Sequence, residues 1–264
     1  MTIGLGILAN NAVIIASDTQ VGITDYMKTQ QGKISYAAKY DVGQQQVAVG
    51  VMGAGHNAYL THLGQDFTRF LGVDQRTPSM SEFEEFASRH LAQFYLDHVI
   101  PFAAYPDRPE VWLLLGYWAR GAVKLWRSAH NALTESSTYA TVGVGEIYAT
   151  GIMGQMYLPM WPLTPQMAVL LAAYVIHRVK DRIDGCGKDT EIVCIGPTRT
   201  ARFPKDAIDP LEEMLDTYLR VEADALHHVF SAERGPTSKN LSRNLRRFRA
   251  DLEKLPLFQK FDQF

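Results

Sequence analysis

Short apolar runs dominate the first part of the chain and predict β-strands. They occupy residues 3–9, 12–17, 33–37 and 46–52. The first two are rich in Ile and Val and are separated by Asn10 and Asn11, which tolerate the positive φ of a tight hairpin. Because the apolar character is continuous rather than alternating, we expect these strands to be covered on both faces.

Apolar positions three and four residues apart predict amphipathic helices further along the chain. The expected helices span residues 57–71, 80–98, 146–156 and 164–182. Further strands are expected at residues 110–118, 121–128, 138–144 and 190–196. The order of strands, two helices, strands, two helices and a strand indicates two stacked sheets with a pair of helices outside each. The predicted fold class is therefore α+β, a four-layer αββα sandwich.

The composition changes near residue 205, where charged segments with helical patterns begin. These segments span residues 209–231 and 238–254 and are divided by a Gly-Pro pair. We therefore expect one domain over residues 1–204 and a helical C-terminal extension over residues 205–264, packed on the same domain or at a subunit interface. The second segment is basic, which is typical of a solvated helix face, with subunit contact as the alternative.

Charge and composition exclude several classes of protein. The 264 residues carry a formal net charge of -2, which gives no overall attraction to nucleic acid or to an anionic membrane. No apolar run approaches the roughly 20 residues needed to span a bilayer. The two cysteines, Cys186 and Cys194, fit neither a disulfide framework nor a four-ligand zinc site. We therefore expect a reducing, cytoplasmic location and no metal or other cofactor.

Thr2 is the first candidate for chemistry, because it directly follows the initiator methionine. Cytosolic processing normally removes Met1 before a residue as small as threonine, which leaves Thr2 as the free N-terminus. Its α-amine, with an unperturbed pKa of roughly 7.7–8.0, can then take the proton of its own hydroxyl. Nucleophile and base would thus lie on one residue.

Three further residues are expected to support that hydroxyl. Lys33 would disfavour the protonated amine and lower the pKa of the threonine hydroxyl. Asp18, at the end of the second expected strand, would keep Lys33 charged and oriented. The backbone N–H of Gly53 would donate to the developing oxyanion without side-chain obstruction. Taken singly, these residues also fit ordinary roles as a strand threonine, a turn aspartate, an exposed lysine and a turn glycine.

The order of these residues resembles the N-terminal pattern of the proteasome β-subunit family. That pattern is a threonine, a two-stranded hairpin, an Ala-Ala-Asp-like signature and then a lysine. Here it reads Thr2-Ile3-Gly4, Ala16-Ser17-Asp18 and Gly32-Lys33-Ile34, followed by Met52-Gly53-Ala54-Gly55 and Val142-Gly143-Val144-Gly145. The resemblance covers roughly residues 2–200 and is that of a divergent bacterial relative of these N-terminal-nucleophile (Ntn) hydrolases.

The resemblance also implies roles for other residues. Gln20 resembles the residue at this position in the simpler bacterial proteasome-like peptidase, whereas most proteasomes have an arginine there. Val51 falls where the family has a residue that shapes the specificity pocket, and a valine there would favour apolar substrate side chains. We therefore expect Gln20 and Val51 in the substrate pocket. Asp181 fits a supporting aspartate, and Asp184 or Cys186 falls near a supporting serine. Val144 replaces a serine that hydrogen-bonds the N-terminal amine in the family, so one orienting partner of that amine is missing.

The function that this resemblance implies is a threonine-type endopeptidase acting on peptides or unfolded proteins. It further implies self-assembly into a homo-oligomeric ring or ring-like particle, with an ATP-dependent unfoldase as an additional partner. Three alternatives stay open: a small-molecule amidase, a transpeptidase of the same superfamily, and a catalytically inactive structural ring subunit.

Overall fold

The computed structural model describes residues 2–22, 28–41, 44–73, 77–102, 109–160, 162–230 and 237–255. The chain divides into two compact units, Met1–Arg202 and Phe203–Phe264. All described strands belong to the first unit, and the described part of the second unit contains two helices.

One five-stranded sheet has the order β10-β1-β2-β11-β12 and is antiparallel throughout. Its strands are β1 (Ile3–Ala9), β2 (Ala12–Asp18), β10 (Tyr139–Gly143), β11 (Thr190–Ile195) and β12 (Thr200–Arg202). β1 and β2 form the predicted hairpin, with Asn11 at a φ of 55° in the turn. Every residue of β2 and β11 is buried, as their continuous apolar runs indicate.

The second five-stranded sheet has the order β5-β6-β7-β8-β9 and is also antiparallel. Its strands are β5 (Ile34–Asp41), β6 (Gln44–Gly55), β7 (Val111–Ala119), β8 (Ala122–Ala129) and β9 (Ala132–Ser136). Side chains along β6 alternate between two cores, since successive residues of a strand point to opposite faces. Val47 and Val49 pack in the helix-covered core, whereas Ala48 and Met52 pack against the other sheet.

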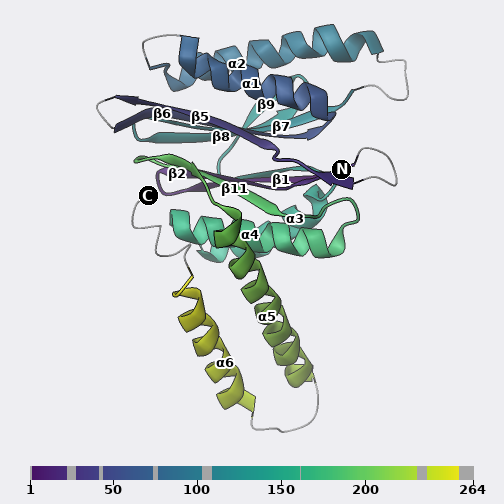
Figure 1. Cartoon of the computed structure of the whole chain (residues 1–264), viewed down its shortest axis with the longest axis vertical. Coiled ribbons are helices and arrows are strands. Elements are labelled where there is room, and N and C mark those ends of the chain that lie inside the picture. Colours follow the sequence, from purple (N-terminus) through teal and green to yellow (C-terminus); the bar gives the residue numbers. More distant parts are fainter. Residues whose placement is uncertain are drawn as a thin grey trace. The chain divides into compact units, whose positions relative to one another are not determined.

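Two helix pairs cover the outer faces of the stacked sheets (Figure 1). They are α1 (Asn57–Val73) and α2 (Met80–Phe94) on the second sheet, and α3 (Glu146–Met160) and α4 (Pro165–Arg182) on the first. The predicted four-layer αββα sandwich is confirmed. The helix predicted over residues 80–98 is shorter, because after Phe94 the chain continues as a π-helical turn over Tyr95–Val99 and a 3-10 turn over Ile100–Phe102.

Four short strands were not predicted, and they lack an apolar pattern. β3 (Gln20–Gly22) and β4 (Lys28–Gln30) form a separate two-stranded sheet, and β4 is exposed at all three positions. β9 and β12 are edge strands of the large sheets and are likewise largely unburied. A strand that buries little apolar surface leaves little hydrophobic periodicity to detect.

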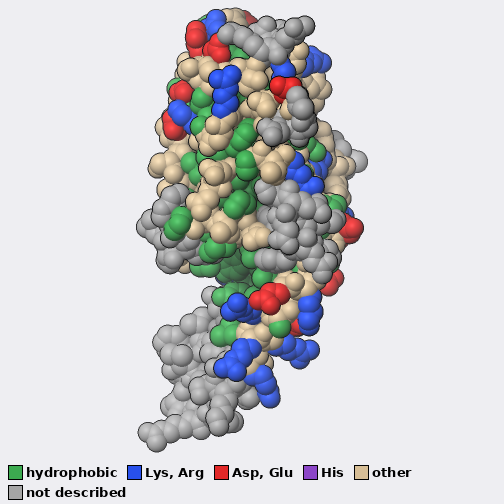
Figure 2. Space-filling model, turned by 90° about the vertical axis from the view of Figure 1, so that its left-hand side faces the viewer, with side chains coloured by type: hydrophobic (Ala, Val, Ile, Leu, Met, Phe, Trp, Pro, Cys, Tyr) green, Lys and Arg blue, Asp and Glu red, His purple; other side chains and the backbone are tan. Residues whose placement is uncertain are grey.

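The second unit contains α5 (Lys205–Phe230) and α6 (Thr237–Leu252), which contact each other. The rings of Tyr218 and Phe248 lie 5.2 Å apart between them. Figure 2 shows basic side chains gathered over this part of the chain. Arg247 and Arg249 are exposed and pair with acidic residues four positions further along, as on a solvated helix face. None of the described helices combines the length and apolar character that a bilayer span requires.

Candidate active site

Thr2, Asp18 and Lys33 meet at one end of the two sheets. Thr2 precedes β1 and Asp18 ends β2, so the antiparallel pairing of these strands brings the two residues together. Lys33 directly precedes β5 of the other sheet. Thr2 Oγ1 donates to Asp18 Oδ1 at 2.5 Å, while Lys33 Nζ donates to the same carboxylate oxygen at 2.8 Å and to Thr2 Oγ1. The hydroxyl therefore contacts both charged groups.

The Asp18 carboxylate is fully buried, and backbone N–H groups supply its remaining hydrogen bonds. Ile3 N–H donates to Oδ1 at 3.0 Å, and Gln20 and Gly187 N–H donate to Oδ2 at 3.3 and 3.1 Å. A buried carboxylate is stabilised only when it is paired and hydrogen-bonded, and both conditions hold here. The charge of Asp18 is thus held rigidly beside Thr2.

Lys33 is almost buried, with 8% of its side chain exposed. Burial lowers the pKa of Lys33 from its usual value, although the neighbouring Asp18 carboxylate acts in the opposite direction. A lysine with a lowered pKa exchanges its proton more readily near neutral pH than a solvent-exposed lysine. Its ammonium form also favours a negative charge on the Thr2 oxygen that it contacts.

Glu191, on β11, holds the backbone that carries Lys33, and sequence reasoning missed it. Its side chain is 5% exposed, and Oε2 accepts from the N–H of Lys33 at 2.8 Å and of Ile34 at 3.2 Å. Its Oε1 lies 2.7 Å from Arg202 Nη2. A lone acidic residue inside the apolar run 190–196 was the available signal, because a buried carboxylate needs specific partners.

Cys186 lies near Lys33 and Asp18 but is poorly suited to act as a nucleophile. The residue is 6% exposed, and burial raises the pKa of its thiol to about 12, with Asp18 contributing in the same direction. The thiolate is the reactive form of cysteine, so a protonated thiol is inert at neutral pH. Cys186 therefore fits the structural role expected of a cysteine in a glycine turn.

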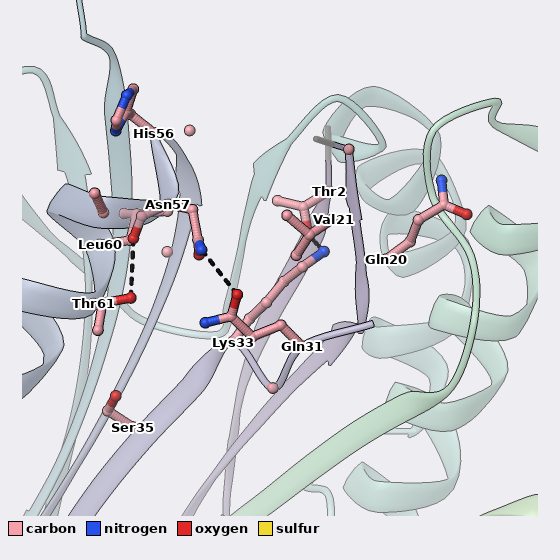
Figure 3. A pocket seen from close by; sticks show the side chains of 15 residues that line it. Thr2, Gln20, Val21, Gln31, Lys33, Ser35, His56, Asn57, Leu60 and Thr61 are labelled. Atoms are coloured by element: carbon pink, nitrogen blue, oxygen red, sulfur yellow. Dashed lines mark hydrogen bonds between the residues drawn. The ribbon is translucent and has the colours of Figure 1, made fainter. Parts of the chain in front are cut away.

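A cavity of about 470 Å³ opens beside these residues (Figure 3). Thr2, Lys33, Gly53 and Gln20 are among its lining residues. Gly53 lies within β6, and a Cβ built there would come within 2.3 Å of Leu60 Cδ2, so a side chain at this position would displace Leu60. The side-chain amide of Gln20 lies beside Gly187, where a built Cβ would be 2.7 Å from Oε1.

Three of the residues named from the sequence are not brought to this cavity. Val51 is 2% exposed and packs in the helix-covered core, because it lies on the same face of β6 as Val47 and Val49. Asp181 is exposed and pairs with Arg182 at 3.1 Å, and Asp184 is also exposed. The turn that follows them contributes the backbone N–H of Gly187 rather than a carboxylate.

A second cavity of about 390 Å³ also reaches Thr2 and is lined by Trp112, Val144 and Glu146. Val144 is 48% exposed there and offers no hydroxyl to the end of the chain. Gly145 N–H donates to the Thr2 carbonyl at 3.5 Å. Within the described residues, no group of three or more His, Cys, Asp or Glu side chains is arranged to hold a metal ion.

The stacked antiparallel sheets between two helix pairs form the proteasome-like Ntn-hydrolase fold. Solved Anbu structures share it. An Anbu mutant from Hyphomicrobium sp. strain MC1 aligns with a TM-score of 0.69 and 13% identity, over 89% of this chain and 99% of that one. Anbu from Yersinia bercovieri, described as an ancestral beta-subunit, aligns with a TM-score of 0.68 and 15% identity, again over 89% of this chain and 99% of that one. A chain from a helical assembly of the Anbu complex from Pseudomonas aeruginosa aligns with a TM-score of 0.67 and 12% identity, over 90% of this chain and 99% of that one.

The expected assignment to the proteasome β-subunit family, as a divergent bacterial relative, is wrong. No protein-family model matches the chain, and no curated protein matches it. The similar solved structures described above are Anbu proteins, and at 12–15% identity they show the fold alone. The motifs around Thr2, Asp18 and Lys33 are short and lie at the ends of strands that the fold itself requires, so they indicate the fold better than the family.

Proposed function

We propose that the chain is a threonine-type peptidase that hydrolyses peptide bonds with Thr2 as nucleophile. The observation that carries this proposal is the Thr2 hydroxyl held between the Asp18 carboxylate and the Lys33 ammonium at the edge of a cavity. A hydroxyl becomes an effective nucleophile when a base takes its proton and a nearby cation stabilises the oxyanion.

The proposed reaction begins when removal of Met1 frees the α-amine of Thr2. Met1 lies outside the described residues. The amine takes the hydroxyl proton as Thr2 Oγ1 attacks the substrate carbonyl, and Lys33 stabilises the charge on that oxygen. The N–H of Gly53 donates to the oxyanion of the tetrahedral intermediate. The amine then protonates the leaving nitrogen, and water hydrolyses the remaining ester to release the acid and regenerate Thr2.

We further propose that the protein acts in the cytoplasm as a homo-oligomer on peptides or unfolded chains, with an ATP-dependent unfoldase as partner. Support for assembly comes from the Anbu complex of Pseudomonas aeruginosa, which is described as a helical assembly. Size-exclusion chromatography with light scattering on the purified chain tests this part, and a monomer at micromolar concentration would contradict it.

Intact-mass measurement before and after treatment with a threonine-directed covalent inhibitor tests the catalytic proposal. We expect a chain that lacks Met1 and gains one adduct, and we expect Thr2→Ala to gain none. Thr19→Ala is the matched control, because Thr19 is buried next to Asp18 in sequence but does not contact Thr2 Oγ1 through any described hydrogen bond. A wild-type chain that lacks Met1 and never gains the adduct would refute the proposal.

A catalytically inactive structural subunit is the second candidate, and Val144 is the observation that favours it. Its exposed apolar side chain stands where the expected serine would orient the amine. The same mass measurement separates the two candidates, since retention of Met1 blocks the Thr2 amine and favours the structural role.

A further inference from the structure

We propose that the cavity beside Thr2 selects substrates whose acyl residue carries a neutral carboxamide side chain, as glutamine and asparagine do. This inference rests on the proposed function, because it names the substrate class of the same site. It takes the place of the apolar preference expected from Val51, whose side chain does not line the cavity.

Two side-chain amides face each other in this cavity. Gln31 lies between β4 and β5, and Asn57 is the first residue of α1. Asn57 Nδ2 donates to Gln31 Oε1 at 2.8 Å, and both residues line the cavity (Figure 3). Thr2, Lys33 and Gly53 line the same cavity, so the amide pair borders the proposed reacting centre.

The amide pair retains hydrogen-bond donors and acceptors for a ligand. The hydrogen bond between the amides leaves Gln31 Nε2 and Asn57 Oδ1 without a hydrogen bond to another described residue. A carboxamide presents a carbonyl oxygen and an NH₂ group side by side, and these match that donor and acceptor. Exchanging O and N in both amides reverses their mutual hydrogen bond but again leaves the NH₂ group of one amide and the carbonyl oxygen of the other without a hydrogen bond.

Among the described residues that line the cavity, only Lys33 and His56 carry ionisable side chains. Ser35 and Thr61 add hydroxyl groups, and Thr61 Oγ1 donates to the Asn57 carbonyl at 3.0 Å. Lys33 is already paired with the buried Asp18. No described lining side chain is a carboxylate, and the Lys33 ammonium already pairs with Asp18, so a charged substrate side chain would lose water for little gain in counter-charge.

An apolar side chain would be disfavoured for a different reason. Gln31 and Asn57 are both exposed, so an apolar side chain that covers them would remove Gln31 Nε2 and Asn57 Oδ1 from water without replacing those hydrogen bonds. A site built to hydrogen-bond a substrate discriminates strongly against an analogue that lacks the bonding groups, because its own polar atoms are then left unpaired. The cavity of about 470 Å³ has room for a side chain of the size of glutamine.

Hydrolysis of four fluorogenic peptides tests the proposed selectivity. The peptides are identical except for Gln, Leu, Glu or Lys at the acyl residue, and the purified full chain is the enzyme. We expect kcat/KM for the Gln peptide to exceed that for each of the others by about tenfold or more. A Leu, Glu or Lys peptide that is cleaved as fast as the Gln peptide would overturn the inference.

Gln31→Met provides a matched test, since it keeps the length of the side chain and removes both amide groups. We expect the ratio of kcat/KM between the Gln and Leu peptides to fall about tenfold. Gln65→Met, the same change at an exposed position of α1, is expected to leave the ratio unchanged. An unchanged ratio in Gln31→Met would contradict the assigned role of the amide pair.

A covalent probe with glycine at the acyl residue separates failure of the inference from failure of the proposed function. A Thr2 adduct with this probe, together with equal cleavage of all four peptides, would refute the carboxamide selectivity and leave the peptidase intact. Absence of both adduct and cleavage would refute both proposals. An adduct together with preferred cleavage of the Gln peptide would support both.

Discussion

Two buried carboxylates hold Lys33, and they act on different parts of it. Asp18 contacts the side chain, since Lys33 Nζ donates to Oδ1 at 2.8 Å, and it also accepts the Thr2 hydroxyl at 2.5 Å. Glu191 contacts the backbone, since Lys33 N–H donates to Oε2 at 2.8 Å, and its other oxygen pairs with Arg202. Asp18 therefore affects the electrostatics of the Thr2 hydroxyl and the Lys33 ammonium, whereas Glu191 fixes the position of the Lys33 backbone.

The two carboxylates come from neighbouring positions of paired strands. Asp18 lies opposite Thr190 in the β2–β11 pairing, and Glu191 lies opposite Ser17. β2 and β11 belong to one sheet, while Lys33 leads into the other. The contacts of Asp18 and Glu191 with Lys33 thus join the two sheets at the end where Thr2 lies. Each contact buries a carboxylate, which is stable there only because it is paired.

Asp18→Asn is expected to have the largest effect, because it removes the charge at nearly constant shape. We expect peptide hydrolysis to fall by about 10²-fold or more and the free energy of unfolding to fall by about 3–5 kcal/mol, since Lys33 is left buried without a counter-charge. Peptide kinetics and urea unfolding measure the two effects. Asp41→Asn, at the exposed end of β5, is the control. Activity within a few-fold of wild type would show that Asp18 does not act on the reaction.

Glu191→Gln is expected to have an intermediate effect that appears in kcat. The amide oxygen can still accept a backbone N–H, but the charge that strengthens these hydrogen bonds and pairs with Arg202 is lost. We expect kcat to fall about tenfold at nearly unchanged KM, and the free energy of unfolding to fall by about 1–3 kcal/mol.

Arg202→Met separates the two functions of Glu191, because it removes the ion pair and keeps the hydrogen bonds from the Lys33 and Ile34 N–H groups to Glu191, although it also removes the hydrogen bond from Arg202 Nη2 to the Ile34 carbonyl. Since the Arg202 side chain is 43% exposed, we expect a smaller loss of activity than in Glu191→Gln. If Arg202→Met and Glu191→Gln lose equal activity, or if Glu191→Gln changes only KM, then Glu191 does not act by positioning the Lys33 backbone, and its role would not differ from that of Asp18 as described.

The pH dependence of stability should show the smallest effect. The pKa of Lys33 is lowered in the folded chain, so between this value and the unfolded value near 10.5 the unfolded chain binds more protons. The contribution of Lys33 to stability therefore rises with pH through that window, by at most about 1.4 kcal/mol per pH unit. Below the window Lys33 is protonated in both states, so its contribution no longer changes with pH.

Unfolding of Asp18→Asn and of Asp18→Asn/Lys33→Met between pH 8 and 10.5 isolates the effect of burial on Lys33, because both variants lack the carboxylate that raises its pKa. The pH slope should be more positive in the variant that retains Lys33. Identical slopes would mean that burial does not shift the proton affinity of Lys33.

The predictable part of the site lies where local sequence signals suffice. The hairpin of β1 and β2 was predicted from two apolar runs and two asparagines, and it brings Asp18 toward Thr2. Lys33 was predicted as a site residue because it follows Thr2 and Asp18 in the order of the resembled N-terminal pattern. Whether these residues perform catalysis stays a prediction that the inhibitor experiment tests. The family assignment made from the same motifs was wrong.

The site residues that the sequence analysis misplaced or missed depend on which face of a strand a side chain occupies and on contacts between residues far apart in the sequence. Val51 was expected in the pocket, but the alternation along β6 directs it to the helix-covered core. Glu191 meets Lys33 across 158 positions of sequence, and Asn57 meets Gln31 across 26. No local periodicity encodes such pairs, so the polar character of the cavity could not be predicted.

The sequence by itself determined the order of the long, buried strands and the helices, the first hairpin and the layered architecture, because periodicity and turn propensity act over a few residues. Only the tertiary structure decided which charges are buried together around Lys33 and which amides face each other in the cavity. Those contacts arise when two sheets stack, and the angle and register of the stacking depend on the packing of the whole core.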